Sequence, residues 1–137
     1  MRRRTLKSKI HRATVTGADP HDVGSVPIDP ALLELADILP NEQAAVLDID
    51  DGARFETYAI VGAAGEVCLN GAAARLVSPG DRVIITDAEY EAAELERHVP
   101  AVVHVDTANR PVPVEITAAA TTDPRRDAEV PAGDWPS

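Results

Sequence analysis

Residues 45–61, AVLDIDDGARFETYAIV, carry the pattern that decides the fold. Residues 45–50 favour one strand, Asp51-Gly52 is a strong hairpin-turn signal, and residues 54–61 favour the return strand. Alternate side chains of a strand point to opposite faces. One predicted face carries Phe55, Thr57, Ala59 and Val61, and the other carries Arg54, Glu56, Tyr58 and Ile60. The segment therefore indicates a β-rich domain.

Further short strands are predicted on both sides of this hairpin, over residues 7–16, 67–69, 82–86, 99–105 and 112–116. Turns are predicted over residues 17–22, 62–66, 70–71 and 78–81. Asp29-Pro30 is typical of a helix N-cap followed by proline, and that short helix should stop near Leu39-Pro40. Residues 88–98 favour a second helix. Many short strands with closely spaced turns predict a mainly β fold, a small barrel with short helices.

The composition fits a single domain with an aliphatic core. The chain has 137 residues and only four aromatic ones, so a stacking platform for single-stranded nucleic acid is not expected. The single cysteine, Cys68, excludes an intramolecular disulfide framework and a multi-cysteine zinc site. We expect the domain to span residues 1–116 and residues 117–137 to form a mobile, disordered tail.

Charge is unevenly distributed along the chain. The formal net charge is -10, yet residues 1–12 contain six basic side chains and no acidic one. A solvated basic terminus is one explanation. The start, Arg2–Lys7, is not followed by the apolar stretch of an export signal, and no run approaches the roughly 20 residues that span a bilayer. We therefore expect a soluble, cytoplasmic protein that does not associate with a membrane.

Sequence motifs for nucleotide, metalloprotease and serine-hydrolase sites are absent. The four histidines lack ligand spacing with cysteine, so we expect no metal site; they are His11, His21, His98 and His104. A pyridoxal phosphate enzyme would have only Lys7 or Lys9 for its lysine, so that cofactor is not expected either.

Gly24-Ser25 alone would be an ordinary loop dipeptide. Its surroundings change that interpretation, because several segments occur in a specific order: KSKIHRATVT (7–16), ADPHDVGS (18–25), GARFETYAI (52–60), NGAAA (70–74) and PGDRVII (79–85). Together they make the chain, from about Arg4 to Pro113, resemble the pyruvoyl-dependent aspartate 1-decarboxylase family.

The resemblance implies a six-stranded double-psi β-barrel, assembled as a homotetramer with active sites between subunits. It also implies decarboxylation of L-aspartate to β-alanine and CO2 for pantothenate biosynthesis. Such proteins cut themselves before a serine, which matches Ser25. The products would be a β chain of residues 1–24 and an α chain of residues 25–137, with a covalent pyruvoyl group made from Ser25. Gly24 would allow a strained turn at the cut.

The family's functional positions match further residues here. Thr57 matches the hydrogen-bond donor to the Gly24 oxygen during cleavage and also contacts substrate. Tyr58 matches the residue that returns a proton after CO2 leaves. The matched substrate-binding positions are Lys9, Arg54, Asn70, Gly71, Ala72 and Ala73, and His11 is a further candidate. Thr57 and Tyr58 fall on opposite faces of the predicted strand, which a bulge or a place at a subunit boundary would reconcile.

Three positions depart from the family pattern, at Pro20, Asp22 and Arg75. A carboxylate at Asp22, three residues before the cut, would repel a developing oxyanion or alter the turn, and we expect that cleavage still occurs, at a reduced rate. Two alternatives stay open at this point. One is a binding module whose basic terminus holds an acidic partner or DNA, against which the overall negative charge argues. The other is an inactive relative that keeps the fold and no longer cuts itself.

Overall fold

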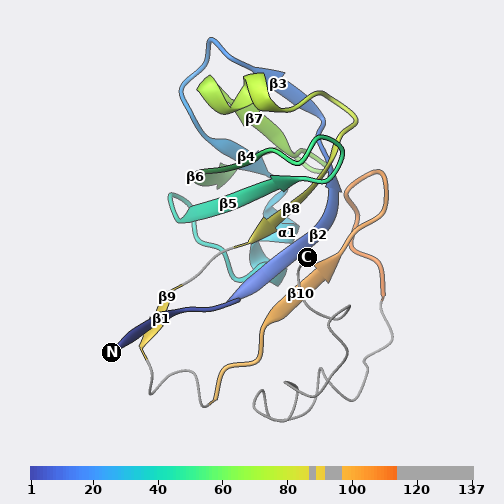
Figure 1. Cartoon of the computed structure of the whole chain (residues 1–137). Helices are drawn as coiled ribbons and strands as arrows, with labels where there is room; N and C mark the ends of the chain where they lie inside the picture. Colours follow the sequence, from blue (N-terminus) through green and yellow to red (C-terminus); the bar gives the residue numbers. More distant parts are fainter. Residues whose placement is uncertain (87–88, 92–96, 114–137) are drawn as a thin grey trace.

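The computed structural model describes residues 1–86, 89–91 and 97–113, and it is mainly β (Figure 1). The strands are β1 (Arg2–Arg4), β2 (Ser8–Thr14), β3 (Gly17–Asp19), β4 (Val26–Ile28), β5 (Gln43–Asp48), β6 (Arg54–Val61), β7 (Cys68–Asn70), β8 (Arg82–Thr86), β9 (Glu89–Glu91) and β10 (Ala101–His104). Two short helices accompany them, α1 (Pro30–Ala36) and the 3-10 helix η1 (Gly71–Leu76).

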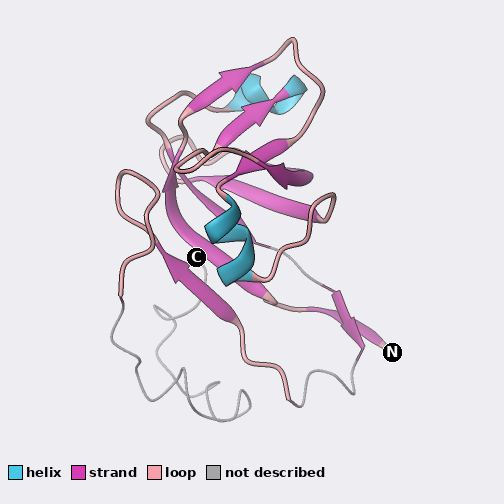
Figure 2. Cartoon of the chain, turned by 180° about the vertical axis from the view of Figure 1, so that it is seen from behind, coloured by secondary structure: helices cyan, strands magenta, loops and turns pink. Residues whose placement is uncertain are grey.

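Six strands form one sheet in the order β10-β2-β8-β5-β6-β4. The longer strands are curled, as the view from behind shows (Figure 2). The two outer pairings, β10 with β2 and β4 with β6, are parallel, and the inner ones are antiparallel. The pairs β1-β9 and β3-β7 are separate two-stranded sheets. The mainly β class is confirmed, and the arrangement is consistent with a small double-psi β-barrel.

The predicted hairpin is present. Its partners run from Gln43 opposite Tyr58 to Leu47 opposite Arg54 without a break. Thr57 and Ala59 are buried while Glu56 and Tyr58 are exposed, as the alternation predicts. No bulge therefore brings Thr57 and Tyr58 to one face.

Helix α1 begins as predicted and ends early. The Asp29 carboxylate accepts a hydrogen bond from the Ala31 N–H at 2.8 Å, which caps the first turn. Asp37 adopts a left-handed conformation with φ 53°, and its N–H closes the last turn. The predicted stop near Leu39-Pro40 was therefore too late.

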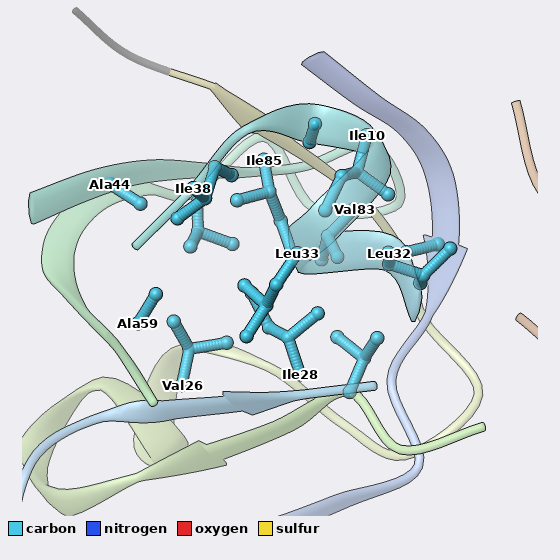
Figure 3. Packing of buried hydrophobic residues seen from close by; sticks show 14 of the residues in the cluster. Ile10, Val26, Ile28, Leu32, Leu33, Ile38, Ala44, Ala59, Val83 and Ile85 are labelled. Carbon is cyan, nitrogen blue, oxygen red and sulfur yellow. The ribbon is translucent and has the colours of Figure 1, made fainter. Parts of the chain in front are cut away.

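The core is aliphatic, as the composition predicts. Leu32 and Leu33 of α1 pack among side chains from the sheet (Figure 3). Others in the cluster include Ile10, Val26, Ile28, Val46, Val83 and Ile85. Phe55 packs against this cluster and is only partly buried. Burial of these side chains supplies the main driving force for folding.

Several local predictions were wrong where strand pairing joins distant segments. Residues 17–19, expected in a turn, form β3 and pair in parallel with β7. Residues 89–91, expected in a helix, form β9 and pair with β1 in the basic terminus. Pairing with a remote strand overrides the local helix propensity there. Strand β4 was also missed.

The chain end is described only as far as residue 113. Val112 and Pro113 lie outside any strand, and Pro111 forms an isolated bridge with Val105, so the strand predicted over 112–116 is wrong at its start. The rest of that strand, the boundary at residue 116 and the predicted tail lie outside the described residues, as do residues 92–96 of the predicted helix. No helix in the described part of the chain is long and apolar enough to cross a membrane.

Candidate active site

Ser25 lies immediately before β4 and is held by Asn70, the last residue of β7. The Asn70 N–H donates to the Ser25 carbonyl at 2.9 Å, and the Asn70 Nδ2 donates to the Ser25 hydroxyl oxygen at 3.3 Å. Both residues are buried, with 7% and 8% of their surface exposed. The Ser25 hydroxyl is thus oriented by a side chain 45 positions away.

Gly71 follows Asn70 and touches the residue before Ser25. Its φ is 74°, and a Cβ atom built on it would lie 2.6 Å from the Gly24 Cα. Only glycine fits both that conformation and that approach. The turn predicted at Asn70-Gly71 is in fact the start of η1, in which Ala72 is exposed and Ala73 packs against the core.

Gly24 does not show the strained turn expected of it. Its φ is outside the left-handed region, and a Cβ there would meet no atom within 4 Å. The glycine that the local geometry requires is Gly71.

Strand β6 brings two more predicted residues to this point. Val26 pairs with Ala59 in parallel, so the residues before them, Ser25 and Tyr58, are neighbours along the same register. Thr57 lies one position further back and is buried, with 8% of its surface exposed. Tyr58 is 55% exposed, and Arg54, on the same face of β6, is exposed too. The structure therefore joins Gly24, Ser25, Asn70 and Gly71 through direct contacts, and the β4–β6 register runs towards Thr57 and Tyr58.

Lys9 and His11 lie elsewhere in the sheet. Lys9 on β2 pairs with Thr86, Thr86 pairs with Ala45, and Ala45 pairs with Glu56 on β6. Strands β8, β5 and β6 lie between β2 and β4 in the sheet order. Among the described residues, no hydrogen bond or ion pair joins Lys9 or His11 to Ser25.

Lys9 is a buried cation with no acidic partner. Only 5% of its surface is exposed, and among the described residues no carboxylate pairs with its ammonium group. Burial lowers the pKa of Lys9. His11 is next to it on the same strand, and its pKa falls to about 4 because of burial and then the Lys9 charge. A buried, unpaired cation is costly unless a ligand supplies the anion.

Comparison with known proteins decides the family. A model of the aspartate decarboxylase family matches residues 1–112. A relative from Syntrophobacter fumaroxidans named aspartate 1-decarboxylase is 56% identical over 115 residues, covering 82% of this chain and 93% of its own length. The chain belongs to the aspartate decarboxylase family.

Two more members carry the same name, aspartate 1-decarboxylase. The one from Pelotomaculum thermopropionicum is 56% identical over 112 residues, covering 80% of this chain and 85% of its own. The one from Heliobacterium modesticaldum is 54% identical over 113 residues, covering 80% and 86%. The resemblance inferred from the ordered motifs is confirmed, and the decarboxylase family places the chain among the carboxy-lyases.

Two residues near the predicted groups were missed by sequence reasoning. In this family member the Cys68 thiol lies 3.5 Å from the Asn70 Oδ1 and donates to it, and burial raises the pKa of that thiol. His104 on β10 lies opposite His11, with ring centroids 5.2 Å apart. The contact between His11 and His104 depends on pairing between remote strands, for which no local signal exists. The Cys68 contact lies within β7, and it became relevant only because Asn70 also holds Ser25.

Three carboxylates of this decarboxylase family member gather at the other end of the hairpin. One carboxylate oxygen from each of Asp48, Asp51 and Asp81 lies within 4.8 Å of the other two. Asp48 is buried and Asp51 is exposed. The β5–β6 turn lies beyond Leu47 and Arg54, whereas Val26, which follows Ser25, pairs with Ala59 near the other end of β6, so the cluster is separate from the Ser25 site.

Proposed function

We propose that this chain is a pyruvoyl-dependent aspartate 1-decarboxylase, which cuts itself between Gly24 and Ser25 and then converts L-aspartate to β-alanine and CO2 for pantothenate biosynthesis. The observation that carries the proposal is the contact of Asn70 with the Ser25 hydroxyl beside the Gly71–Gly24 contact. Through these contacts Asn70 orients the Ser25 hydroxyl while Gly71 packs against the Gly24 backbone on the other side of the Gly24–Ser25 peptide bond.

Self-cleavage uses only groups of this chain and water. The Ser25 hydroxyl oxygen attacks the Gly24 carbonyl carbon, the carbon–nitrogen bond breaks, and the Ser25 nitrogen takes the hydroxyl proton. The ester then eliminates, which leaves a Gly24 carboxylate and a dehydroalanine at position 25. Hydrolysis of that residue consumes water and releases ammonia, and position 25 becomes a pyruvoyl group.

Thr57 is the proposed donor to the Gly24 oxygen, on which negative charge develops. It is buried in β6, and the β4–β6 register supports a position near Gly24. A donor to such an oxygen typically contributes a factor of about 10²–10³ in rate. The proposed donor is therefore testable through the rate of cleavage alone.

The residues around position 25 suit a pyruvoyl group. Asn70 offers an amide donor to an oxygen at this position, and the close backbone approach of Gly71 leaves no bulky neighbour there. When present, the group supplies a carbonyl electron sink that accepts the electron pair left by CO2. In this proposal pyridoxal phosphate and a metal ion have no role.

The chain's own residues would bind the substrate and move a proton. Arg54 offers a planar donor to one carboxylate and Lys9 a point charge to the other. Asn70 and the backbone of Gly71, Ala72 and Ala73 would line the reacting end. Tyr58 would return the proton to the carbon that loses CO2, because its phenol hydroxyl can donate a proton and is exposed on the face of β6 that also carries Arg54.

The separation of Lys9 from Ser25 supports an assembly in which a second copy completes each site. We propose a homotetramer with active sites between subunits, in which Lys9 and His11 of one copy face Ser25 of another. That arrangement would also reconcile the exposed Tyr58 and the buried Thr57 on opposite faces of β6. We expect this enzyme to act in the cytoplasm, where a free thiol such as Cys68 stays reduced.

Intact-mass spectrometry of the purified protein tests the proposal. We expect a fragment of residues 1–24 and a partner chain that begins with a pyruvoyl group, and β-alanine from L-aspartate. Ser25→Ala should stay uncut and inactive, while Ser78→Ala, a change at an exposed serine in a turn, should cut normally. A wild-type chain that remains full length after long incubation would overturn the proposal.

A further inference from the structure

Three basic side chains lie together where β2 and β10 run side by side. Lys9 and His11 are two residues apart on β2, on one face of the strand. His104 on β10 is the direct partner of His11, and the two rings meet edge to face with centroids 5.2 Å apart and planes at 67°. The cluster is defined here as Lys9, His11 and His104.

No negatively charged group of the described residues lies against this cluster. The His11 Nδ1 is buried and has no hydrogen-bond partner. The charged groups that act on His11 are Lys9, His104 and Arg12, and the one that acts on His104 is Lys9. All of them are basic.

The neighbouring elements supply no counter-ion. Strand β8 presents Thr86 opposite Lys9, and its hydroxyl donates to the Ser8 carbonyl. Helix α1 packs on β2 and β10 through Leu32, Leu33 and Ala36, and its Glu34 is exposed. In the described part of the chain, therefore, no carboxylate offsets the charge of Lys9.

This arrangement disfavours protonation of both histidines in the free protein. Burial lowers the pKa of His11 to about 4, with help from the Lys9 charge, and the same two causes lower the pKa of His104. A carboxylate placed on Lys9 would cancel the charge that opposes protonation. The pKa of each imidazole would then rise toward its ordinary value of about 6.5.

We propose that His104 is a further substrate-binding residue, which together with His11 takes up a proton when a dicarboxylate binds at Lys9. The inference rests on the proposed function, because it takes the ligand of Lys9 to be a substrate carboxylate. His104 thereby adds positive charge to the site only when the ligand is present.

The sign of the pH dependence follows from linkage. The bound state holds more protons than the free state, so affinity for the dicarboxylate rises as pH falls from 8 towards 6. Below the pKa of His11 in the free protein, this histidine is already protonated before the ligand binds. The affinity for the dicarboxylate then stops increasing as pH falls further. A site of lysine and arginine alone would show no such change in this range.

Titration calorimetry with succinate tests the inference, since succinate has two carboxylates and no amine to react. The processed enzyme is titrated at pH 6 and pH 8, in two buffers of different ionisation enthalpy. We expect proton uptake at pH 6, and about 3- to 10-fold tighter binding at pH 6 than at pH 8. A threefold to tenfold change corresponds to about 0.7–1.4 kcal/mol.

His104→Phe keeps a ring beside His11 but cannot take a proton, and His104→Gln keeps hydrogen bonding without titration. Both should reduce proton uptake and flatten the pH dependence, with binding at pH 8 changed little. His21→Gln, a change at an exposed histidine, is the matched control and should behave as wild type. If one of the two His104 variants fails to fold, the other is sufficient for the test.

The outcomes separate this inference from the proposed function. Production of β-alanine without proton uptake, or with uptake that survives both His104 variants, overturns the inference alone. Proton-coupled succinate binding by a chain that makes no β-alanine overturns the proposed function alone. No binding of succinate by the processed enzyme counts against the inference.

Discussion

Gly71 approaches Gly24 so closely that a Cβ atom on Gly71 would lie 2.6 Å from the Gly24 Cα and 2.9 Å from its nitrogen. The two backbones, 47 positions apart, are in direct contact beside the proposed cut. This contact sets the position of the Gly24–Ser25 peptide relative to Asn70.

Gly71→Ala should slow self-cleavage strongly. The new methyl group must push the Gly24 backbone away, and the left-handed φ adds about 1–2 kcal/mol of strain. Gly80→Ala is a matched control, because Gly80 also has a left-handed φ, of 93°, yet a Cβ there meets nothing within 4 Å. Intact-mass spectrometry over time should show uncut chain for Gly71→Ala and normal cutting for Gly80→Ala. Equal cutting rates in the two variants would contradict the role given to the contact.

Lys9→Met should stabilise the fold while abolishing substrate binding. Methionine keeps the length of the side chain and removes a buried charge that no carboxylate of the described residues pairs with, which should raise the free energy of unfolding by on the order of 1 kcal/mol. Lys7→Met provides the contrast, because the Lys7 ammonium pairs with Glu42 at 2.6 Å and also donates to the Asp37 carbonyl. Urea unfolding should therefore show Lys7→Met to be the less stable variant. A less stable Lys9→Met would mean that the Lys9 charge has a partner in the free protein.

Asp48→Asn should stabilise the protein at pH 8 and change little near pH 4.5. The Asp48 Oδ2 is buried, has no donor, and faces the carboxyl group of Asp81. Burial, followed by the contact with Asp81, raises the pKa of Asp48 to about 6, while the same contact lowers the pKa of Asp81. A raised folded-state pKa means that stability from this group is present below about pH 4 and is lost as pH rises through 6. An amide donates to Asp81 at every pH and should add on the order of 1–3 kcal/mol at pH 8.

Denaturant unfolding at the two pH values measures this effect. Asp50→Asn is the control from the same turn, since Asp50 is exposed and accepts from the Arg82 N–H at 2.7 Å. Its effect should be similar at both pH values. A gain for Asp48→Asn that is as large at pH 4.5 as at pH 8 would argue against ionisation as the cause.

Asn109→Ala should be among the most destabilising single changes outside the apolar core. Asn109 is fully buried; its Oδ1 accepts from the Thr14 N–H at 2.7 Å, and its Nδ2 donates to the Thr14 and Gly65 carbonyls at 2.8 and 2.9 Å. Alanine leaves these backbone groups without partners, at a cost of on the order of 2–4 kcal/mol. Asn41→Ala shares the left-handed backbone but is exposed, so it should cost about 1 kcal/mol or less. Thermal unfolding of the two variants gives the comparison, and similar midpoints would contradict it.

Local patterns predicted the elements whose signals are contained in a short stretch. The β5–β6 hairpin follows from Asp51-Gly52 and the alternation around it, and α1 begins where Asp29-Pro30 indicates. The predictions for the segments that form β3 and β9 were wrong, because each of these strands exists through pairing with a segment far away in the sequence. Neither Gly17–Asp19 nor Glu89–Glu91 has a residue pattern that favours a strand on its own.

In the candidate site, too, the sequence indicated some residues, while contacts between distant segments could not be predicted. Gly24 and Ser25 became candidates only through the ordered set of motifs, since the dipeptide itself is uninformative. The contact between Gly71 and Gly24 could not be predicted, because it depends on β7 and η1 folding back over the segment before β4. His104 was not singled out, because its neighbour His11 is reached only across two paired strands.

The place of β2 in the sheet has a consequence for how the processed protein can be made. Strand β2 lies between β10 and β8 and buries Ile10 and Ala13 in the core. A cut before Ser25 leaves β1, β2 and β3 on a separate peptide that is still woven into the barrel. If the chain cuts itself as proposed, folding must precede cutting, and the product is an assembly of two peptides. Once denatured, each subunit would have to regain its structure by an encounter of two peptides, so the return of its β-sheet signal should depend on protein concentration more steeply than that of the uncut Ser25→Ala chain, whose subunit refolds from one piece.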